Sequence, residues 1–157
     1  MKVTIVAVGR ARGTLGEAVA EYEARAAHYW KLEVVEVDAG SGGGDRPDDV
    51  MEAEAGRILA RVPEDARLVA LTREGKGMTS VGLSRWLDRL RVHGREGACF
   101  VIGGAFGLHP RLLSRAARRL SLSPMTLPHE LARLVLAEQI YRAGTIARGE
   151  PYHKGGR

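Results

Sequence analysis

Cysteine, carboxamide side chains and long apolar runs are all scarce in this chain of 157 residues. It contains one cysteine, Cys99, no asparagine and one glutamine. A single cysteine excludes an internal disulfide and fits a protein that works in the reducing cytoplasm. No apolar run approaches the roughly 18 residues of a membrane-spanning helix, and the N-terminus has no signal-peptide cleavage pattern. We therefore expect a cytoplasmic protein without a membrane segment, and we expect no bound metal.

Lysine is scarce as well, and the positive charge is unevenly placed. The chain has 20 arginines against 4 lysines, with a net charge of +5. Residues 104–157 carry 9 basic and 3 acidic residues, whereas residues 1–103 carry 15 and 16. A localised basic region suits a phosphate-rich partner such as a nucleic acid. A solvated, arginine-rich helix face is the alternative that composition leaves open.

Short runs rich in β-branched residues alternate with helix-like segments. With 45% hydrophobic and 27% charged residues, the composition is that of one globular domain over residues 1–157. The first helix is expected to open with a capping box of Thr14 and Glu17, and the third with a cap at Thr79 or Ser80. The alternation predicts an α/β fold with a mostly parallel sheet and flanking helices. Strands are predicted at 2–8, 32–37, 67–71, 98–102 and in the LSLS run from 120, and helices at 14–28, 48–62, 80–93, 110–119 and 128–148.

Three strand ends have the composition of a binding site. Leu71 is followed by TREGKG, which is predicted as a loop, and Ile102 is followed by two glycines. The stretch 120–129, LSLSPMTLPH, combines hydroxyls and apolar side chains with a break at Ser123-Pro124. Ligands of parallel α/β sheets bind beyond the carboxyl ends of the strands, so these segments predict one site. An ordinary β-to-α connection is the alternative for 120–129, and neither a dinucleotide fingerprint nor a Walker A loop is present.

The last predicted helix carries polar side chains on two faces. His129 and Arg133 lie about 40° apart around its axis, and Glu138 and Arg142 lie roughly opposite. A helix that only packs on a sheet needs one apolar stripe, so this pattern suggests two different surfaces. We expect one face to line the active site and the other to meet a second subunit or the substrate. A surface ion pair is the alternative for Glu138 and Arg142.

The end of the chain extends the same region. Tyr152, His153 and Lys154 follow the last predicted helix, and such a terminal segment is often disordered. Because that helix starts at the proposed ligand loop, with Pro128 at its first position, the tail can also fold back across the site.

Taken together, these segments resemble one protein family. IGGAFGLH, LSLSPMTLPHELARLVLAEQIYRA and RGEPYHK, with KVTIVAVG and LTREGKGMTS nearer the N-terminus, resemble the small SPOUT-class methyltransferases. Those enzymes methylate N3 of a pseudouridine in 23S ribosomal RNA, and the motifs span essentially the whole chain. Residues 155–157 extend past the usual end of the family, and no role is inferred for them.

The resemblance implies more than the residue patterns predict. It implies a SPOUT fold with a deep trefoil knot in the C-terminal part, a homodimer, and the assembled ribosome as substrate. It also implies that S-adenosylmethionine is the cofactor and lies bent in the knot. By position, the residues that contact the cofactor would be Leu71, Gly103, Leu122, Ser123, Pro124, Met125, Thr126 and Leu127.

The family chemistry, transfer of a methyl group from a sulfonium to a ring nitrogen, assigns roles to the last helix and the tail. The sulfonium is already activated, so the enzyme mainly positions the reactants, and N3 must lose its proton. We expect Glu138 or His153 to act as general base, and Arg142 to stabilise negative charge on the neighbouring carbonyl oxygens. Tyr152 is expected to stack on the base.

Three further residues of this region are expected to hold RNA phosphates: His129, Arg133 and Lys154. Two alternatives stay open for the function as a whole. A related SPOUT enzyme would methylate another RNA position or a ribose hydroxyl. A non-catalytic RNA-binding module would share the basic C-terminal third without needing the ligand loop.

Overall fold

A five-stranded parallel sheet forms the centre of the structure. It was obtained as a computed structural model, which describes residues 1–41, 43, 46–94 and 97–154. The strand order is β2-β1-β4-β3-β5, and every neighbouring pair is parallel. The predicted α/β class with a parallel sheet is therefore confirmed. The strands are β1 (Lys2–Val8), β2 (Lys31–Val37), β3 (Ala66–Lys76), β4 (Gly97–Ile102) and β5 (Arg118–Leu120).

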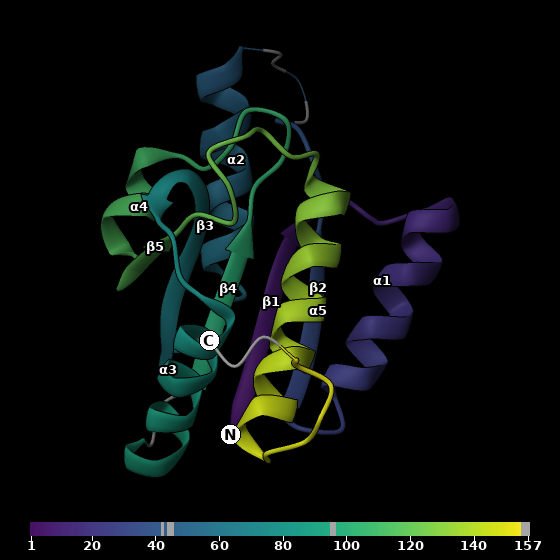
Figure 1. The fold of residues 1–157 in the computed structure, drawn as a ribbon. Helices are drawn as coiled ribbons and strands as arrows, with labels where there is room; N and C mark the ends of the chain where they lie inside the picture. Colours follow the sequence, from purple (N-terminus) through teal and green to yellow (C-terminus); the bar gives the residue numbers. More distant parts are fainter. Residues whose placement is uncertain (42, 44–45, 95–96, 155–157) are drawn as a thin grey trace.

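Helices cover both faces of this sheet (Figure 1). One face is covered by α1 (Gly13–Ala26), α3 (Ser80–His93) and α5 (His129–Ala147), with α5 packed between the other two. The opposite face is covered by α2 (Pro47–Leu59) and α4 (Pro110–Arg115). The result is a three-layer arrangement in which β1 and β4 are enclosed on both sides. No helix in the described ranges is long and apolar enough to span a membrane.

The central strands owe their form to continuous apolar runs. In β1, Val3 and Ile5 enter the core beneath α5, whereas Val6 and Val8 enter the core beneath α2. A strand with both faces covered needs apolar residues at successive positions rather than at alternate ones. Cys99 lies in β4 as predicted, fully buried, and burial raises the pKa of its thiol to about 12. It is a core residue.

The edge of the sheet near the proposed site differs from the prediction. β3 continues to Lys76, with a register shift after Leu71, so the predicted loop at 72–77 is largely strand. The fifth strand, β5, ends at Leu120, and the rest of the LSLS run is a loop, so the strand predicted there is wrong. The physical reason is an unusually close approach of two backbones. A Cβ at Gly75 would lie 2.6 Å from the carbonyl oxygen of Arg119, so only glycine lets β5 pair here.

The start of α1 also corrects the prediction. The helix begins at Gly13 with Arg12 as N-cap, and no side chain caps it, so Thr14 and Glu17 form no capping box. The backbone N–H of Arg12 instead donates to the carboxylate of Glu130 at 3.2 Å. A carboxylate from α5 therefore binds at the start of α1, where the helix dipole favours negative charge.

The starts of α3 and α5 bear on the predicted caps. Thr79 caps α3 by accepting a hydrogen bond from the N–H of Gly82 at 2.9 Å. Pro128 is the N-cap of α5 rather than its first helical residue, and His129 begins the helix. The helix α5 therefore starts directly at the end of the 120–129 stretch.

Candidate functional site

The three predicted strand ends meet at one cavity of about 390 Å³. Its walls come from residues 71–74 of β3, 102–108 after β4 and the segment that leads into α5. Cavities of this size commonly hold cofactor-sized ligands. Seven of the eight residues predicted to contact a cofactor line it, and Pro124 does not. Those lining residues are Leu71, Gly103, Leu122, Ser123, Met125, Thr126 and Leu127.

Glycines shape the wall that follows β4. Gly107 has a positive φ of 81°, and its N–H donates to the carbonyl of Gly104 at 3.1 Å. A Cβ on Gly103 would lie 2.8 Å from the carbonyl carbon of Gly107. A side chain at Gly103 would collide with the turn, and one at Gly107 would be strained by the positive φ, so both glycines are needed for the loop to fold back on itself.

Hydroxyl groups hold the opposite wall against β3. The Ser123 hydroxyl accepts from the N–H of Met125 at 3.0 Å, and Thr126 accepts from Arg73 at 3.1 Å. Ser121 donates to the carbonyl of Arg73 at 3.1 Å. The hydroxyls predicted to bind ligand therefore stabilise the loop, and five leucines are among the residues that line the cavity.

His129 lies at the floor of the cavity, where α5 begins. Its ring lines the cavity and also packs on Gly9, where a Cβ would come within 3.1 Å of Nε2. That Nε2 is buried and has no hydrogen-bond partner among the described residues. His129 therefore offers an unused polar atom next to the space for a ligand.

Arg133 has a different position from the one predicted. Its side chain is 8% exposed, and it donates to Glu23 at 2.8 Å and to Glu36 at 2.6 Å. Burial alone would lower its pKa, but the hydrogen bonds that it donates to the two carboxylates raise it. A guanidinium enclosed in this way has no free face for an RNA phosphate. Arg133 ties α5 to α1 and β2, and the phosphate-binding role expected for it is not supported.

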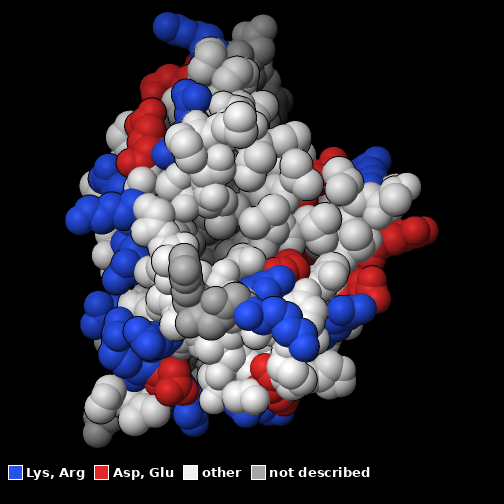
Figure 2. All heavy atoms as spheres, in the orientation of Figure 1, with Lys and Arg blue, Asp and Glu red and all other residues white. Residues whose placement is uncertain are grey.

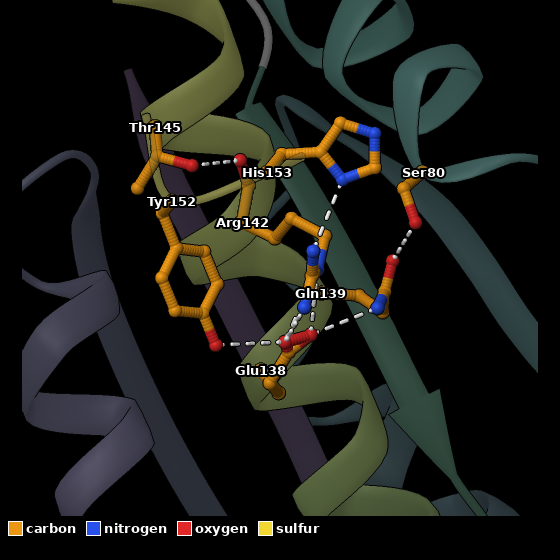
Figure 3. A network of polar contacts seen from close by, with 7 residues as sticks. All are labelled: Ser80, Glu138, Gln139, Arg142, Thr145, Tyr152 and His153. Carbon is orange, nitrogen blue, oxygen red and sulfur yellow. Dashed lines mark hydrogen bonds and ion pairs between the residues drawn. The ribbon is translucent and has the colours of Figure 1, made fainter. Parts of the chain in front are cut away.

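The second cluster of predicted residues lies at the far end of α5, where the tail folds back (Figure 3). Arg142 donates to both carboxylate oxygens of Glu138, at 3.0 to 3.2 Å. The Tyr152 hydroxyl contacts the same carboxylate at a longer 3.4 Å, and the Arg142 guanidinium lies 4.8 Å from the Tyr152 ring centre. The hydrogen bonds with Glu138 raise the pKa of Arg142. Glu138, Arg142, Tyr152 and His153 therefore form one network.

The orientation of His153 follows from its partner. Its Nδ1 lies 3.0 Å from an Nη1 of Arg142. A guanidinium can only donate hydrogen bonds, so Nδ1 accepts, and in the neutral ring the proton is on Nε2. This Nε2 is buried without a partner among the described residues. In this arrangement His153 presents a hydrogen-bond donor.

Sequence reasoning missed two residues of this network, Ser80 and Gln139. The Ser80 hydroxyl donates to the amide oxygen of Gln139 at 2.6 Å, which turns the amide nitrogen toward Glu138 at 2.9 Å. Gln139 is the one glutamine of the chain and follows Glu138 directly. Its place next to Glu138 could have suggested a role in this network. Its partner Ser80 lies on α3 and could not be identified from the sequence.

All four tyrosines of the chain gather around the same network, which the sequence did not predict. Tyr141 lies 4.7 Å from Tyr152 and 5.7 Å from Tyr29, measured between ring centres, and Tyr22 lies 6.2 Å from Tyr141. Tyr29 donates to the Glu150 carboxylate at 2.5 Å, which with burial raises its pKa to about 12. Burial and the nearby Glu138 likewise raise the pKa of Tyr152 to about 12. These contacts hold the tail, of which Lys154 is exposed.

Within one chain, the cavity and the network are separated along α5. At about 1.5 Å per residue, Glu138 lies about 14 Å and Arg142 about 20 Å along the axis from His129. Reacting groups must approach to about 3–3.5 Å for transfer. The structure therefore brings the predicted cofactor residues together and the predicted catalytic residues together, but it does not bring the two sets to each other.

The fold and the cavity at the strand ends are those of a SPOUT methyltransferase. The family described as "Predicted SPOUT methyltransferase" matches residues 1–153, and the chain belongs to this family. Members use S-adenosylmethionine, and the cavity fits it: glycines keep the wall open, leucines suit an adenine ring, and His129 has an unused buried nitrogen. Among the described residues, no group of three or more His, Cys, Asp or Glu could hold a metal ion.

Among named relatives, the chain is 54% identical to the Ribosomal RNA large subunit methyltransferase H of Gemmatimonas aurantiaca, over 98% of this chain and 100% of that protein. It is 47% identical to the protein of the same name from Rubrobacter xylanophilus, over 97% and 98%. A solved structure of a probable methylase family protein from Haemophilus influenzae matches with a TM-score of 0.52 and 14% identity, over 98% of this chain and 70% of that chain. At that identity, the match concerns the fold alone.

Proposed function

We propose that this protein methylates N3 of a pseudouridine in 23S ribosomal RNA, in the cytoplasm and on the assembled ribosome. The observation that carries the proposal is full-length similarity to relatives named ribosomal RNA large subunit methyltransferase H. The tail network of Glu138, Arg142, Tyr152 and His153 also suits a planar base whose N3–H lies between two carbonyl groups.

In the proposed reaction, S-adenosylmethionine supplies a methyl group already activated on a sulfonium. The cavity residues would hold this cofactor, with Leu71, Leu122 and Leu127 around the adenine ring. The chain must then orient the pseudouridine and remove its N3 proton. His153, with its proton on Nε2, suits hydrogen-bond donation to a carbonyl oxygen, which leaves Glu138 as the better candidate for general base.

The contacts of Glu138 indicate how a base would enter. Arg142 holds the carboxylate at 3.0 to 3.2 Å, whereas the Tyr152 hydroxyl is the most distant donor at 3.4 Å. An incoming N–H would replace this longest hydrogen bond with the least loss. Arg142 would remain in place to stabilise negative charge on the substrate. The Tyr152 ring would then be free to stack on the base.

We further propose that the working enzyme is a homodimer in which each site is composite. The predicted catalytic groups of one subunit lie about 14–20 Å along α5 from its own cavity, too far for transfer to a base held in the tail network. An antiparallel second copy would bring its tail to the cavity of the first. The proposal needs no change of conformation within the subunit.

The proposal includes a deep trefoil knot at the cavity, as the family resemblance implies. The segment after β5 passes close to the end of β3, where the N–H of Ser121 donates to the carbonyl of Lys76 at 2.9 Å. It then shares the cavity with residues 102–108 before α5 begins, and the two segments cross at the top of Figure 1. Threading of the C-terminal part through this loop would account for such a crossing.

Nucleoside mass spectrometry of ribosomal RNA tests the reaction. RNA from a strain lacking this protein should lose N3-methylpseudouridine, and purified protein with S-adenosylmethionine should restore it on ribosomes from that strain. A loss of a ribose-methylated nucleoside instead would support the related SPOUT alternative. Failure to bind S-adenosylmethionine in calorimetry would favour a non-catalytic RNA-binding module.

Mixed dimers test the composite site. Gly103→Val should close the cavity, because even a Cβ there would lie 2.8 Å from the Gly107 backbone, and Arg142→Gln should disrupt the network. Each variant alone should be inactive. Random mixing should restore about a quarter of the wild-type rate, since half of the dimers are mixed and each has one intact site of two. A mixture no more active than its components would refute the arrangement.

A further inference from the structure

A run of unpaired positive charge follows the β5 edge of the sheet. Figure 2 shows lysine and arginine side chains along one side of the molecule, over the positions of α4, β5 and α3, with acidic side chains above and below them. We name this surface the β5-edge strip. Its members are Arg73, Lys76, Arg85, Arg89, Arg115, Arg118 and Arg119.

Contacts between the elements show that these residues are neighbours. The Arg118 guanidinium lies 5.3 Å from the ring centre of Trp86, which stands between Arg85 and Arg89 on α3. On the other side of the strand, Arg119 donates to the carbonyl of Leu113 in α4 at 3.3 Å. The strip therefore runs continuously from α3 across the edge strand to α4.

The charges on the strip have no anionic partner among the described residues. None of its seven members forms an ion pair with any residue in the described ranges, whereas Arg91 and Arg111 on the same helices pair with Asp88 and Glu52. Six of the seven side chains are exposed. A row of exposed cations repels itself, so it is most stable against an external anion.

The strip also leads to the cofactor cavity. Arg73 lines the cavity and donates to Thr126 in its wall. Lys76 ends β3 and is paired in register with Leu120 of the edge strand. A phosphate backbone lying on the edge would therefore reach the mouth of the cavity.

We propose that the β5-edge strip binds the sugar-phosphate backbone of ribosomal RNA beside the methylated nucleotide. The inference rests on the proposed function for the identity of the RNA, although the strip could bind RNA even if the reaction were different. The tail network, about 14–20 Å from the cavity, is large enough to contact one base. An extended strip of cations can instead bind the phosphates of the neighbouring nucleotides, which position the RNA without reading its sequence.

A triple variant tests the strip. Arg85, Arg89 and Arg115 are exposed and make no hydrogen bond with a described residue, so changing all three to glutamine should leave the fold intact. The matched control changes Lys31, Arg46 and Arg61 to glutamine, which removes the same charge from exposed positions elsewhere.

Two measurements separate this inference from the proposed reaction. In filter binding of transcribed 23S ribosomal RNA between about 50 and 200 mM salt, log affinity falls with log salt, and the strip variant should make this negative slope shallower by about 2–3, at about 0.7–0.9 per lost contact. In methyl transfer to unmodified ribosomes, KM should rise about tenfold or more with kcat unchanged. If the protein transfers no methyl group to any RNA, the proposed reaction fails, and the salt dependence of RNA binding still tests the strip.

The opposite results are equally clear. Equal salt slopes for the strip variant and the control variant would overturn the inference and leave the arginines as protection against edge-to-edge pairing of β5. If the triple variant fails to fold, the double variant Arg85→Gln/Arg89→Gln, confined to α3, should make the salt slope shallower by about 1–2. An unchanged slope in that variant would also overturn the inference.

Discussion

Gly144 provides the sharpest test of how the tail is held. It lies inside α5, where alanine is usually the better helix former by about 1 kcal/mol. A Cβ at this position would lie 2.4 Å from Cγ and 2.5 Å from Cβ of Tyr29. Rotation of the side chain would move Cγ but not Cβ, so the backbone of Tyr29 must also move. Its hydrogen bond to Glu150 would then weaken.

The estimated free energies decide whether Gly144→Ala stabilises or destabilises the protein. Overpacking a core contact costs about 1–3 kcal/mol, and weakening the hydrogen bond from Tyr29 to Glu150 costs about 1 kcal/mol more. The gain in helix propensity offsets about 1 kcal/mol of this. Gly144→Ala should therefore destabilise the protein by about 1–3 kcal/mol. In contrast, a Cβ at Gly56 in α2 would lie 3.8 Å from the nearest atom, on Arg111, so Gly56→Ala should stabilise by about 0.5–1 kcal/mol.

Urea unfolding at one fixed protein concentration measures both effects, because the stability of the proposed dimer would depend on concentration. In thermal unfolding, 1 kcal/mol corresponds to about 2–4 °C for a chain of this length. The two glycine-to-alanine changes should shift the midpoint in opposite directions. The reasoning is refuted if Gly144→Ala is as stable as wild type while Gly56→Ala gains the expected stability.

Three other variants address the interior, the pH dependence and the cavity. Arg133→Leu should lose about 3–5 kcal/mol of unfolding free energy, because the largely enclosed Glu23 is left without its cation, and Arg133→Leu/Glu23→Leu should recover most of it in urea titrations. The raised pKa of Tyr29 means that the folded state keeps a proton that the unfolded state releases, so the stability contributed by this proton is full below pH 10 and is lost toward about pH 12. Tyr29→Phe should therefore flatten the fall of Tm over this pH range, and the same fall of Tm in wild type and variant would contradict this. Gly103→Val should weaken S-adenosylmethionine binding about tenfold or more in calorimetry with the fold intact by circular dichroism, whereas Gly77→Ala, with nothing within 4 Å, should bind normally.

Local patterns in the sequence predicted much of the fold. The β-branched run of β1 determined a strand with the predicted bounds, Lys2–Val8, because apolar residues at successive positions suit only a strand that is covered on both faces. The cap at Thr79 was equally local, since donor and acceptor lie three residues apart. The predicted strand ends also met at one cavity, because parallel strands finish at the same edge of a sheet.

The tertiary structure decided what depends on distant partners. Arg133 looked like an RNA ligand by its place on α5, but its partners Glu23 and Glu36 lie 110 and 97 residues away. The extension of β3 depended on Gly75 meeting a strand whose own sequence, RRL, has no clear strand pattern. Periodicity and caps report interactions within a few residues, whereas pairing across the fold depends on which surfaces packing brings together. The sequence by itself therefore determined the family, the sheet and the cavity, and the tertiary structure decided that the cavity and the tail network lie at opposite ends of α5.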